Sequence, residues 1–145
     1  MLKKCQMIGQ RLFSGRIAVA QAAMAYRKSL YTSTKLYTDG KKCWAPQASS
    51  PRELPSLSDI PQLVDLYDEE AVRYEQMESF LNACEKELSV CLESNSMPDT
   101  ALIEAIAVAK VKAVEESIEM TFRLKQEVGS YALMKGSGFE EMGKL

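Results

Sequence analysis

The sequence contains no histidine, one tryptophan and only four cysteines among its 145 residues. Without histidine, the chain cannot build a Ser-His-Asp triad, a Cys-His dyad or the usual zinc hydrolase site. The cysteines, Cys5, Cys43, Cys84 and Cys91, form no CxxC pair and no metal-ligand spacing. We therefore predict no metal site and interpret all four as reduced thiols of an intracellular protein, most of them filling core space.

Long apolar runs and a net positive charge are also missing. The longest stretch without a formal charge, Ile17–Tyr26, is ten residues, which is too short to span a membrane. The net charge of −2 argues against nucleic-acid binding. Residues 1–52 nevertheless carry +9 and residues 53–145 carry −11. We interpret this as attraction between two halves of one fold, the alternative being a basic arm for an anionic partner.

No stretch alternates in the manner of a β-strand. The apolar spacing instead predicts an all-α protein, an antiparallel bundle of three long helices over about residues 16–38, 58–94 and 99–128. A fold of this kind buries one face of each helix against the other two.

The ends of the chain differ in character from this helical domain, which we place at residues 15–139. Residues 1–14 form a basic extension or the start of the first helix, and residues 140–145 form a loose tail. Met1–Gln21 is basic, amphipathic and free of acids, so it resembles a mitochondrial transit peptide. The alternative is a mature helix that begins near the N-terminus.

The first helix is followed by the only long loop. Apolar residues recur on one side of this helix at helical spacing, namely Ile17, Ala20, Met24, Leu30 and Tyr31. The loop, Asp39–Leu57, contains three prolines and the single tryptophan, Trp44.

The second helix is predicted to begin near Ser58, with Ser58 or Asp59 as its cap and Pro61 in its first turn. Apolar residues then follow in steps of four and three, with Glu70 as the single polar member: Leu63, Tyr67, Glu70, Tyr74, Met77, Leu81, Cys84, Leu88 and Cys91. We interpret the acids of this helix as a solvated face, namely Asp65, Asp68, Glu69, Glu70 and Glu75.

The third helix is predicted to be capped by Asp99 or Thr100, and Gly129 is predicted to end or bend it. It carries two apolar rows side by side. One row is Leu102, Ile106, Ala109, Ala113, Met120 and Leu124, and the other is Ile103, Ala107, Val111, Val114, Ile118 and Phe122. This face is wider than one helix contact requires, so we expect a fourth helix or a second chain to cover it.

Several short segments, taken in order, resemble the C-terminal helical domain of acyl-CoA dehydrogenases and acyl-CoA oxidases. They are Gly15-Arg-Ile-Ala-Val-Ala-Gln-Ala-Ala23, Tyr37-Thr-Asp-Gly-Lys-Lys-Cys-Trp44, Leu57-Ser-Asp-Ile-Pro-Gln62, Ala109-Lys-Val-Lys-Ala113 and Gln126-Glu-Val-Gly-Ser-Tyr-Ala-Leu133. The second is similar to the family's Tyr-x-x-x-Arg-x-x-Phe-Gly signature, and the last to its Gln-x-x-Gly-Gly-x-Gly-Tyr ending. The resemblance covers about Gly15 to Phe139 and implies an incomplete four-helix bundle.

The resemblance implies that FAD is the cofactor, although not one that this chain binds alone. Lys41 matches the family's arginine that reaches the flavin diphosphate, and it keeps the charge but not the bidentate fork. Trp44 matches the phenylalanine of that signature. Gln126, Gly129 and Ser130 match the glutamine and two glycines near the adenine dinucleotide.

The resemblance implies no catalytic residue in this chain. The family's usual base is a glutamate in a Tyr-Glu-Gly motif beyond the third helix, and this sequence does not contain that motif. Some members place the base on the first helix, but residues 16–37 include no acid. Because a proton cannot leave the acyl α-carbon without a positioned base, we expect no dehydrogenation by this chain alone.

These observations support two hypotheses for function. The first is the C-terminal bundle of a flavin-dependent acyl-CoA dehydrogenase or oxidase in fatty acyl-CoA oxidation. The second is a non-catalytic helical scaffold subunit of a larger assembly. Either would associate through apolar helix faces, as a homo-oligomer or in a larger complex. We favour the mitochondrion over the peroxisome and the cytoplasm.

Overall fold

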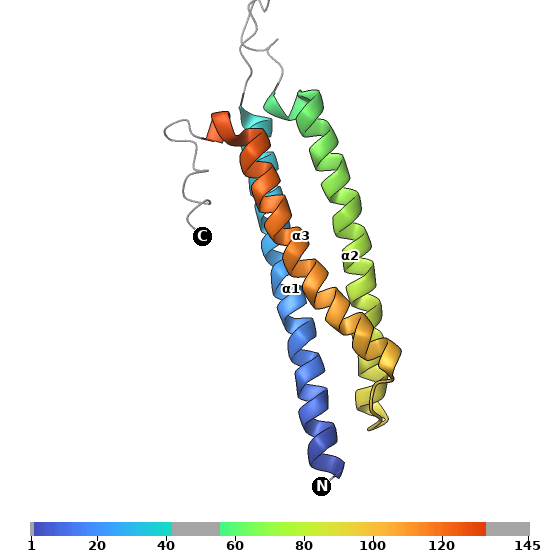
Figure 1. Ribbon diagram of the computed structural model, residues 1–145. Coiled ribbons are helices and arrows are strands. Elements are labelled where there is room, and N and C mark those ends of the chain that lie inside the picture. The colour runs from blue at the N-terminus through green and yellow to red at the C-terminus, as the bar shows by residue number, and fades with distance from the viewer. Residues whose placement is uncertain (1, 42–55, 133–145) are drawn as a thin grey trace, which may run out of the picture. The chain divides into compact units, whose positions relative to one another are not determined.

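The computed structural model describes residues 2–41 and 56–132, which form three long helices (Figure 1). They are α1 (Leu2–Gly40), α2 (Pro61–Glu93) and α3 (Thr100–Ala132), and a short 3₁₀ turn, η2 (Leu57–Asp59), precedes α2. No strand occurs in these two ranges. The all-α prediction is therefore confirmed, and α1 already includes residues 2–14.

The chain divides into two compact units, and every long helix contributes a segment to each. The first unit comprises Met1–Tyr26 and Arg73–Ile118, and the second comprises Arg27–Val72 and Glu119–Leu145. Within each unit, the α1 and α3 segments run in the same direction and the α2 segment runs in the opposite one (Figure 1). Neighbours along the chain are thus antiparallel, as predicted for this bundle.

The core of the first unit draws on all three helices. Ala20, Ala109 and Ala113 are fully buried, and side chains this small let helix backbones approach closely. The other buried members of this core are Phe13, Ile17, Met24, Met77, Leu81, Cys84, Leu88, Leu102 and Ile106.

The core of the second unit has larger side chains. Its buried members are Leu30, Leu57, Leu63, Leu66, Tyr67, Met120, Leu124 and Val128. Leu57 belongs to η2, so this turn closes the end of the unit where α1 finishes and α2 begins.

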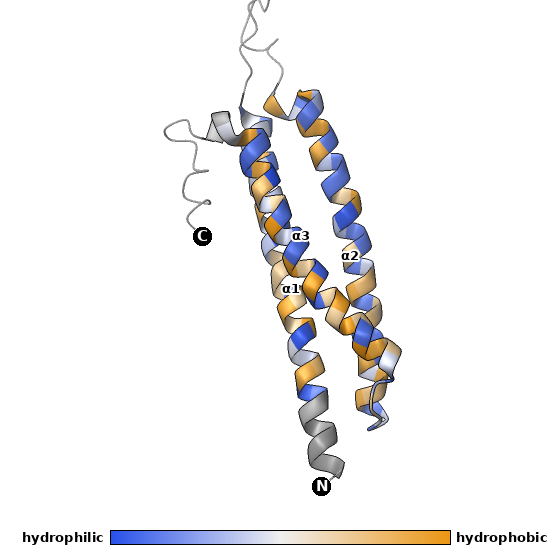
Figure 2. Cartoon of the chain, in the orientation of Figure 1, coloured by the Kyte–Doolittle hydropathy of each residue, from blue (hydrophilic) through white to orange (hydrophobic). Residues whose placement is uncertain are grey.

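The apolar patterns predicted for α2 and α3 are mostly confirmed. Every member of the α2 seam is buried or half-buried, including Glu70. The first apolar row of α3 is buried throughout. In its second row, however, Val111 is 51% exposed, Ile118 52% and Phe122 67%. Figure 2 shows hydrophobic and hydrophilic residues interleaved along all three helices, as expected of amphipathic helices.

The turn between α2 and α3 is built from specific caps. Asn95 adopts a left-handed conformation with φ of 53°, and the N–H of Ser96 donates to the carbonyl of Cys91 at 2.9 Å, which closes the C-terminus of α2. The carboxylate of Asp99 then accepts from the N–H of Leu102 at 2.8 Å. Asp99 is therefore the N-cap of α3, as predicted.

Two predictions for the helix ends differ from the structure. Gly129, predicted to end or bend α3, does not end it, because the helix continues to Ala132; a glycine in a helix costs only about 0.5–1 kcal/mol, and the buried Val128 anchors this turn. At the start of α2, Asp59 accepts instead from the N–H of Ser56 at 3.1 Å. The first α2 amides point to the carbonyl of Ile60, and Pro61 is the first helical residue, as proline favours.

Candidate functional site

The residues predicted to contact a cofactor all belong to the second unit. Lys41 directly follows α1 and is half-buried, whereas Gln126 lies exposed on α3. The ends of α1 (cyan) and α3 (red) lie at the same end of this unit (Figure 1). Trp44 lies outside the described residues, and Ser130 is described only as part of the α3 backbone.

The backbone at Lys41 is held by η2. The N–H of Leu57 donates to the carbonyl of Lys41 at 2.8 Å, and the Leu57 side chain is buried in the core of the second unit. This hydrogen bond holds residues 41 and 57 side by side, and Lys41 is the first residue after α1. A half-buried lysine of this kind suits an anionic group such as a diphosphate.

Gly129 offers room for a close approach to the α3 backbone. Among the described residues, and leaving aside the neighbouring backbone of α3, a Cβ placed on Gly129 would meet no atom within 4 Å. The carboxamide of Gln126, one turn earlier, can both donate and accept hydrogen bonds. An ammonium and a carboxamide can both hydrogen-bond to a ligand, and the assignment of that ligand as a dinucleotide stays a prediction.

A network of hydroxyl groups, which the sequence did not reveal, lies at the end of the second unit where α1 finishes. The hydroxyl of Thr38 is 2.7 Å from that of Tyr67 and 2.8 Å from that of Ser58. It also donates to the carbonyl of Thr34, at 3.1 Å. The ring of Tyr67 meets that of Tyr31 edge-on, with centroids 5.6 Å apart. The network joins α1 to η2 and to α2, three residues before Lys41 in the sequence.

Burial controls the titration of Tyr67. Removal from water raises the pKa of its phenol above the usual 10.0, and the hydrogen bond between Tyr67 and Thr38 only partly offsets this. The neutral phenol is therefore the form that the folded protein stabilises. It acts as a structural hydrogen-bond partner and not as a base.

The interpretation of Glu70 as part of a solvated face is wrong. Glu70 on α2 is 1% exposed and pairs with Arg27 on α1, which is fully buried. Arg27 donates through both Nε and Nη2, the latter at 2.9 Å from Oε2. A signal was available in the sequence: Arg27 is three residues after Met24 and four before Tyr31, so it occupies a core position opposite the one polar member of the α2 seam.

The other acids of this group are solvated, as predicted. Asp65, Asp68, Glu69 and Glu75 are all exposed. Glu69 nonetheless receives two hydrogen bonds from Arg123 on α3, at 2.9 and 3.0 Å. An exposed pair of this kind stabilises the fold by about 0–1 kcal/mol.

The thiols behave as core residues where the structure describes them. Cys84 and Cys91 are both free, the first buried and the second half-buried. Burial raises the pKa of the Cys84 thiol, which disfavours the reactive thiolate. The side chain of Cys5, like all of Cys43, lies outside the described part of the chain.

Neither metal chemistry nor a membrane span is supported by the described residues. Among them, no three cysteine, aspartate or glutamate side chains converge in a way that could hold a metal ion. No described helix is long and apolar enough to cross a membrane. Comparison with protein families, with characterised proteins and with solved structures finds no match.

Proposed function

We propose that this chain is the C-terminal helical-bundle part of a flavin-dependent acyl-CoA dehydrogenase or oxidase. The observation that carries the proposal is the order of five family-like segments along one all-helical chain. Of the matched residues, Lys41 directly follows α1, and Gln126 and Gly129 belong to the last turns of α3, whose end lies at the same end of the second unit as the end of α1.

The cofactor is FAD in this proposal, which accepts a hydride equivalent from the acyl substrate when bound. Lys41 would hold the diphosphate by charge. Gln126 would hydrogen-bond to the adenosine portion, and Gly129, with Ser130 beside it, would leave space for that portion at the α3 backbone. Other protein segments, from a second subunit or from sequence beyond these residues, would complete the site.

Catalysis is assigned elsewhere in the complete enzyme. The α1 segment Arg16–Tyr37 contains no carboxylate, so it cannot supply the base that removes the α-proton of the acyl group. The role of this chain is therefore to bind part of the flavin and to associate with other subunits. We place the assembly in the mitochondrion because the first residues of α1 are basic and free of acids.

Reading the genomic and transcript sequence on either side of the coding region tests this proposal. We expect in-frame sequence for a β-domain and an N-terminal helical domain, and a Tyr-Glu-Gly motif beyond the third helix. Flanking sequence without such coding potential would count against the proposal.

A non-catalytic scaffold subunit is the second candidate. The exposed apolar second row of α3 favours it, because an uncovered apolar row of this length marks an interaction surface. The two candidates differ in flavin content. A scaffold would form a stable complex without the visible absorbance of flavin, whereas the first proposal requires flavin in the assembly.

A further inference from the structure

An exposed apolar strip runs along α1 in the first unit. Leu12 is 50% exposed, Val19 44% and Tyr26 40%, and the residues between them on the same face are Gly15 and Ala22. Their spacing of three and four residues places all five on one side of the helix. No charged residue interrupts this set, which we call the α1 strip.

A second strip runs along α3 in the same unit. It comprises Ala107, Val111, Val114 and Ile118, again at steps of four and three. Val111 and Ile118 are more than half exposed, and the other two are half-buried. We call this set the α3 strip.

The two strips lie on the same side of the first unit. The hydroxyl of Ser117 donates to the carbonyl of Ala23 at 3.1 Å, which marks the line where α3 meets α1. Val19 and Tyr26 lie within one turn of Ala23, and Val114 lies within one turn of Ser117. Both strips therefore border the α1–α3 contact.

The remaining helix of this unit, α2, packs on the opposite side of α1 and α3. Gln21 of α1 donates to Glu85 of α2 at 3.0 Å, and Glu116 of α3 lies 3.6 Å from Arg73 of α2. Gln21 and Glu116 point away from the strips, since each is about a third of a turn or more from them on its helix. The α1 and α3 strips thus form one apolar face that α2 does not cover, the α1/α3 face.

We propose that a second copy of this chain docks on the α1/α3 face, related by a two-fold axis parallel to the helices, so that the α1 strip of each copy packs on the α3 strip of the other. This association is independent of the flavin proposal. Three features of the face favour it, and they concern charge, height along the helices and side-chain size.

The charges of the face are self-complementary. The described α1 side chains of this unit, residues 10–26, include Arg11 and Arg16 and no acid. The outer edge of the α3 strip carries the exposed Glu104 and Glu115. Packing α1 on the partner's α3 brings a basic edge to an acidic one. An antiparallel two-fold would instead pack α1 on α1 and α3 on α3, which sets like charges together.

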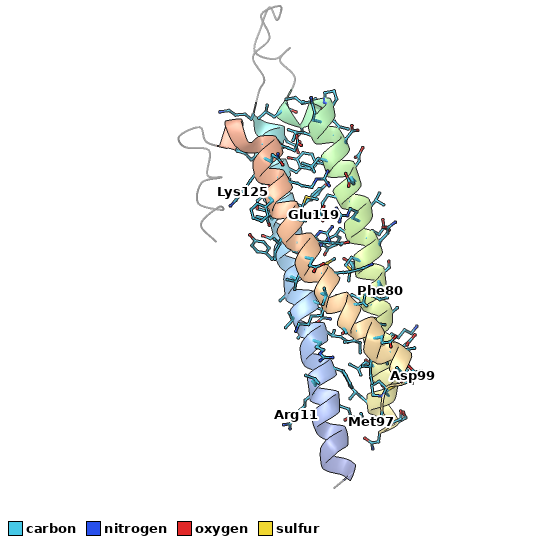
Figure 3. The ribbon with its side chains drawn as sticks, in the orientation of Figure 1. Arg11, Phe80, Met97, Asp99, Glu119 and Lys125 are labelled. Carbon is cyan, nitrogen blue, oxygen red and sulfur yellow. The ribbon has the colours of Figure 1, made fainter. Side chains whose placement is uncertain are left out.

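These charged residues also lie at matching positions along the helix axes, here called heights. In this unit α1 and α3 run in the same direction, with Ala23 level with Ser117. Arg11 precedes Ala23 by 12 residues and Glu104 precedes Ser117 by 13, so their heights differ by about one residue, or about 1.5 Å. Because a two-fold axis parallel to the helices preserves height, Arg11 of each copy meets the partner's Glu104. Arg11 lies exposed on α1 (Figure 3), beside a surface pocket that it lines together with Leu92 of α2.

Side-chain sizes repeat in the same register. On the α1 strip the small residues Gly15 and Ala22 are seven apart, and on the α3 strip the large residues Val111 and Ile118 are seven apart. Measured along the helices from the level of Ala23 and Ser117, Val111 lies just beyond Gly15, and Ile118 lies just beyond Ala22. Apart from the neighbouring backbone of α1, a Cβ on Gly15 would meet no atom of the described residues within 4 Å, so a partner's side chain can approach here. The arrangement is that of knobs entering holes.

Sedimentation equilibrium over a concentration series tests the proposal on the full chain. We expect reversible dimerisation to twice the 16.2 kDa of one chain. Arg11→Glu and Glu104→Arg should each weaken the dimer about tenfold, and the double variant should restore most of the affinity, because the pair is rebuilt with its charges exchanged. Lys86→Glu, which makes the same charge change at an exposed position on α2, is the matched control and should leave the dimer unchanged.

A second pair of variants tests the apolar contact. Ile118→Glu should abolish the dimer, whereas Val90→Glu, at a 60% exposed position on α2, should not. Both positions are on the surface, and far-UV circular dichroism checks that each variant keeps its helices. A chain that stays monomeric at every concentration overturns the proposal. The proposal is also overturned if Ile118→Glu leaves the dimer affinity unchanged, or if the double charge exchange fails to restore it. A different protein bound to the α1/α3 face would overturn it as well.

Discussion

Arg27 on α1 and Glu70 on α2 form an ion pair that is closed to solvent, with the guanidinium donating to both carboxylate oxygens. Removing two charges from water is costly, and their attraction offsets that cost only when the geometry is good. The pair requires these two residues to face each other. We therefore interpret it as fixing how the α1 and α2 segments of the second unit slide against one another.

Breaking this pair should be far more damaging than removing it. Glu70→Ala removes the carboxylate from a buried guanidinium and should lower the free energy of unfolding by about 3–5 kcal/mol. The double variant Arg27→Met with Glu70→Leu should be neutral or more stable by about 1–4 kcal/mol. Urea unfolding measures both. The exposed pair Arg123 and Glu69 is the control, and Glu69→Ala should cost about 1 kcal/mol or less.

The buried phenol of Tyr67 should make the fold sensitive to high pH. Its pKa is raised in the folded protein, so its contribution to stability is complete below pH 10 and is lost as the pH rises through the folded-state pKa. Tyr67→Phe should cost about 0.5–1.5 kcal/mol near neutral pH through the lost hydrogen bond, and its stability should fall less steeply above pH 10. Thermal unfolding against pH measures this. Tyr26→Phe, at an exposed position, should keep the steep fall of the original protein.

The two apolar rows of α3 should respond differently to truncation. Ile106 is fully buried and Ile118 is 52% exposed on the same helix. Ile106→Ala should lower the free energy of unfolding by about 2–5 kcal/mol, since it leaves a cavity. In dilute solution Ile118→Ala should change it by less than about 0.5 kcal/mol. Equal losses at the two positions would mean that the second row is covered within a single chain.

The charge of Lys41 should matter for flavin content. In the assembly isolated with its cofactor, Lys41→Glu should weaken flavin affinity tenfold or more, because a charge-assisted hydrogen bond contributes about 1.5–3 kcal/mol. Lys41→Arg should retain the flavin. Lys35→Glu, at an exposed position on the same helix, is the matched control. Cofactor release on dilution, followed by fluorescence, separates these cases.

Much of the fold follows from periodicity. The spacing of four and three residues that begins at Leu63 predicted the buried side of α2, and the first row of α3, from Leu102 to Leu124, is buried as expected. Asp99 was identifiable as a cap because aspartate before an apolar run has a direct local function. These features depend on neighbours within one or two turns.

The features that were missed depend on residues far apart in the chain. Glu70 looks like one more acid on an acidic helix until Arg27, 43 residues away, is placed opposite it. The hydroxyl group of Thr38 acquires its role only when Tyr67 and Ser58 come within hydrogen-bond distance. Gly129 stays helical because Val128 beside it is held in the core. Helix propensity alone cannot reveal such tertiary contacts.

The flavin content of the protein isolated from its native source, measured from visible absorbance per mole of this chain, decides whether the chain is part of a flavoenzyme. We expect close to one flavin per chain, released together with the assembly's acyl-CoA-oxidising activity when the cofactor is stripped. A stable, well-folded assembly that contains this chain but no flavin would contradict it and would favour the scaffold.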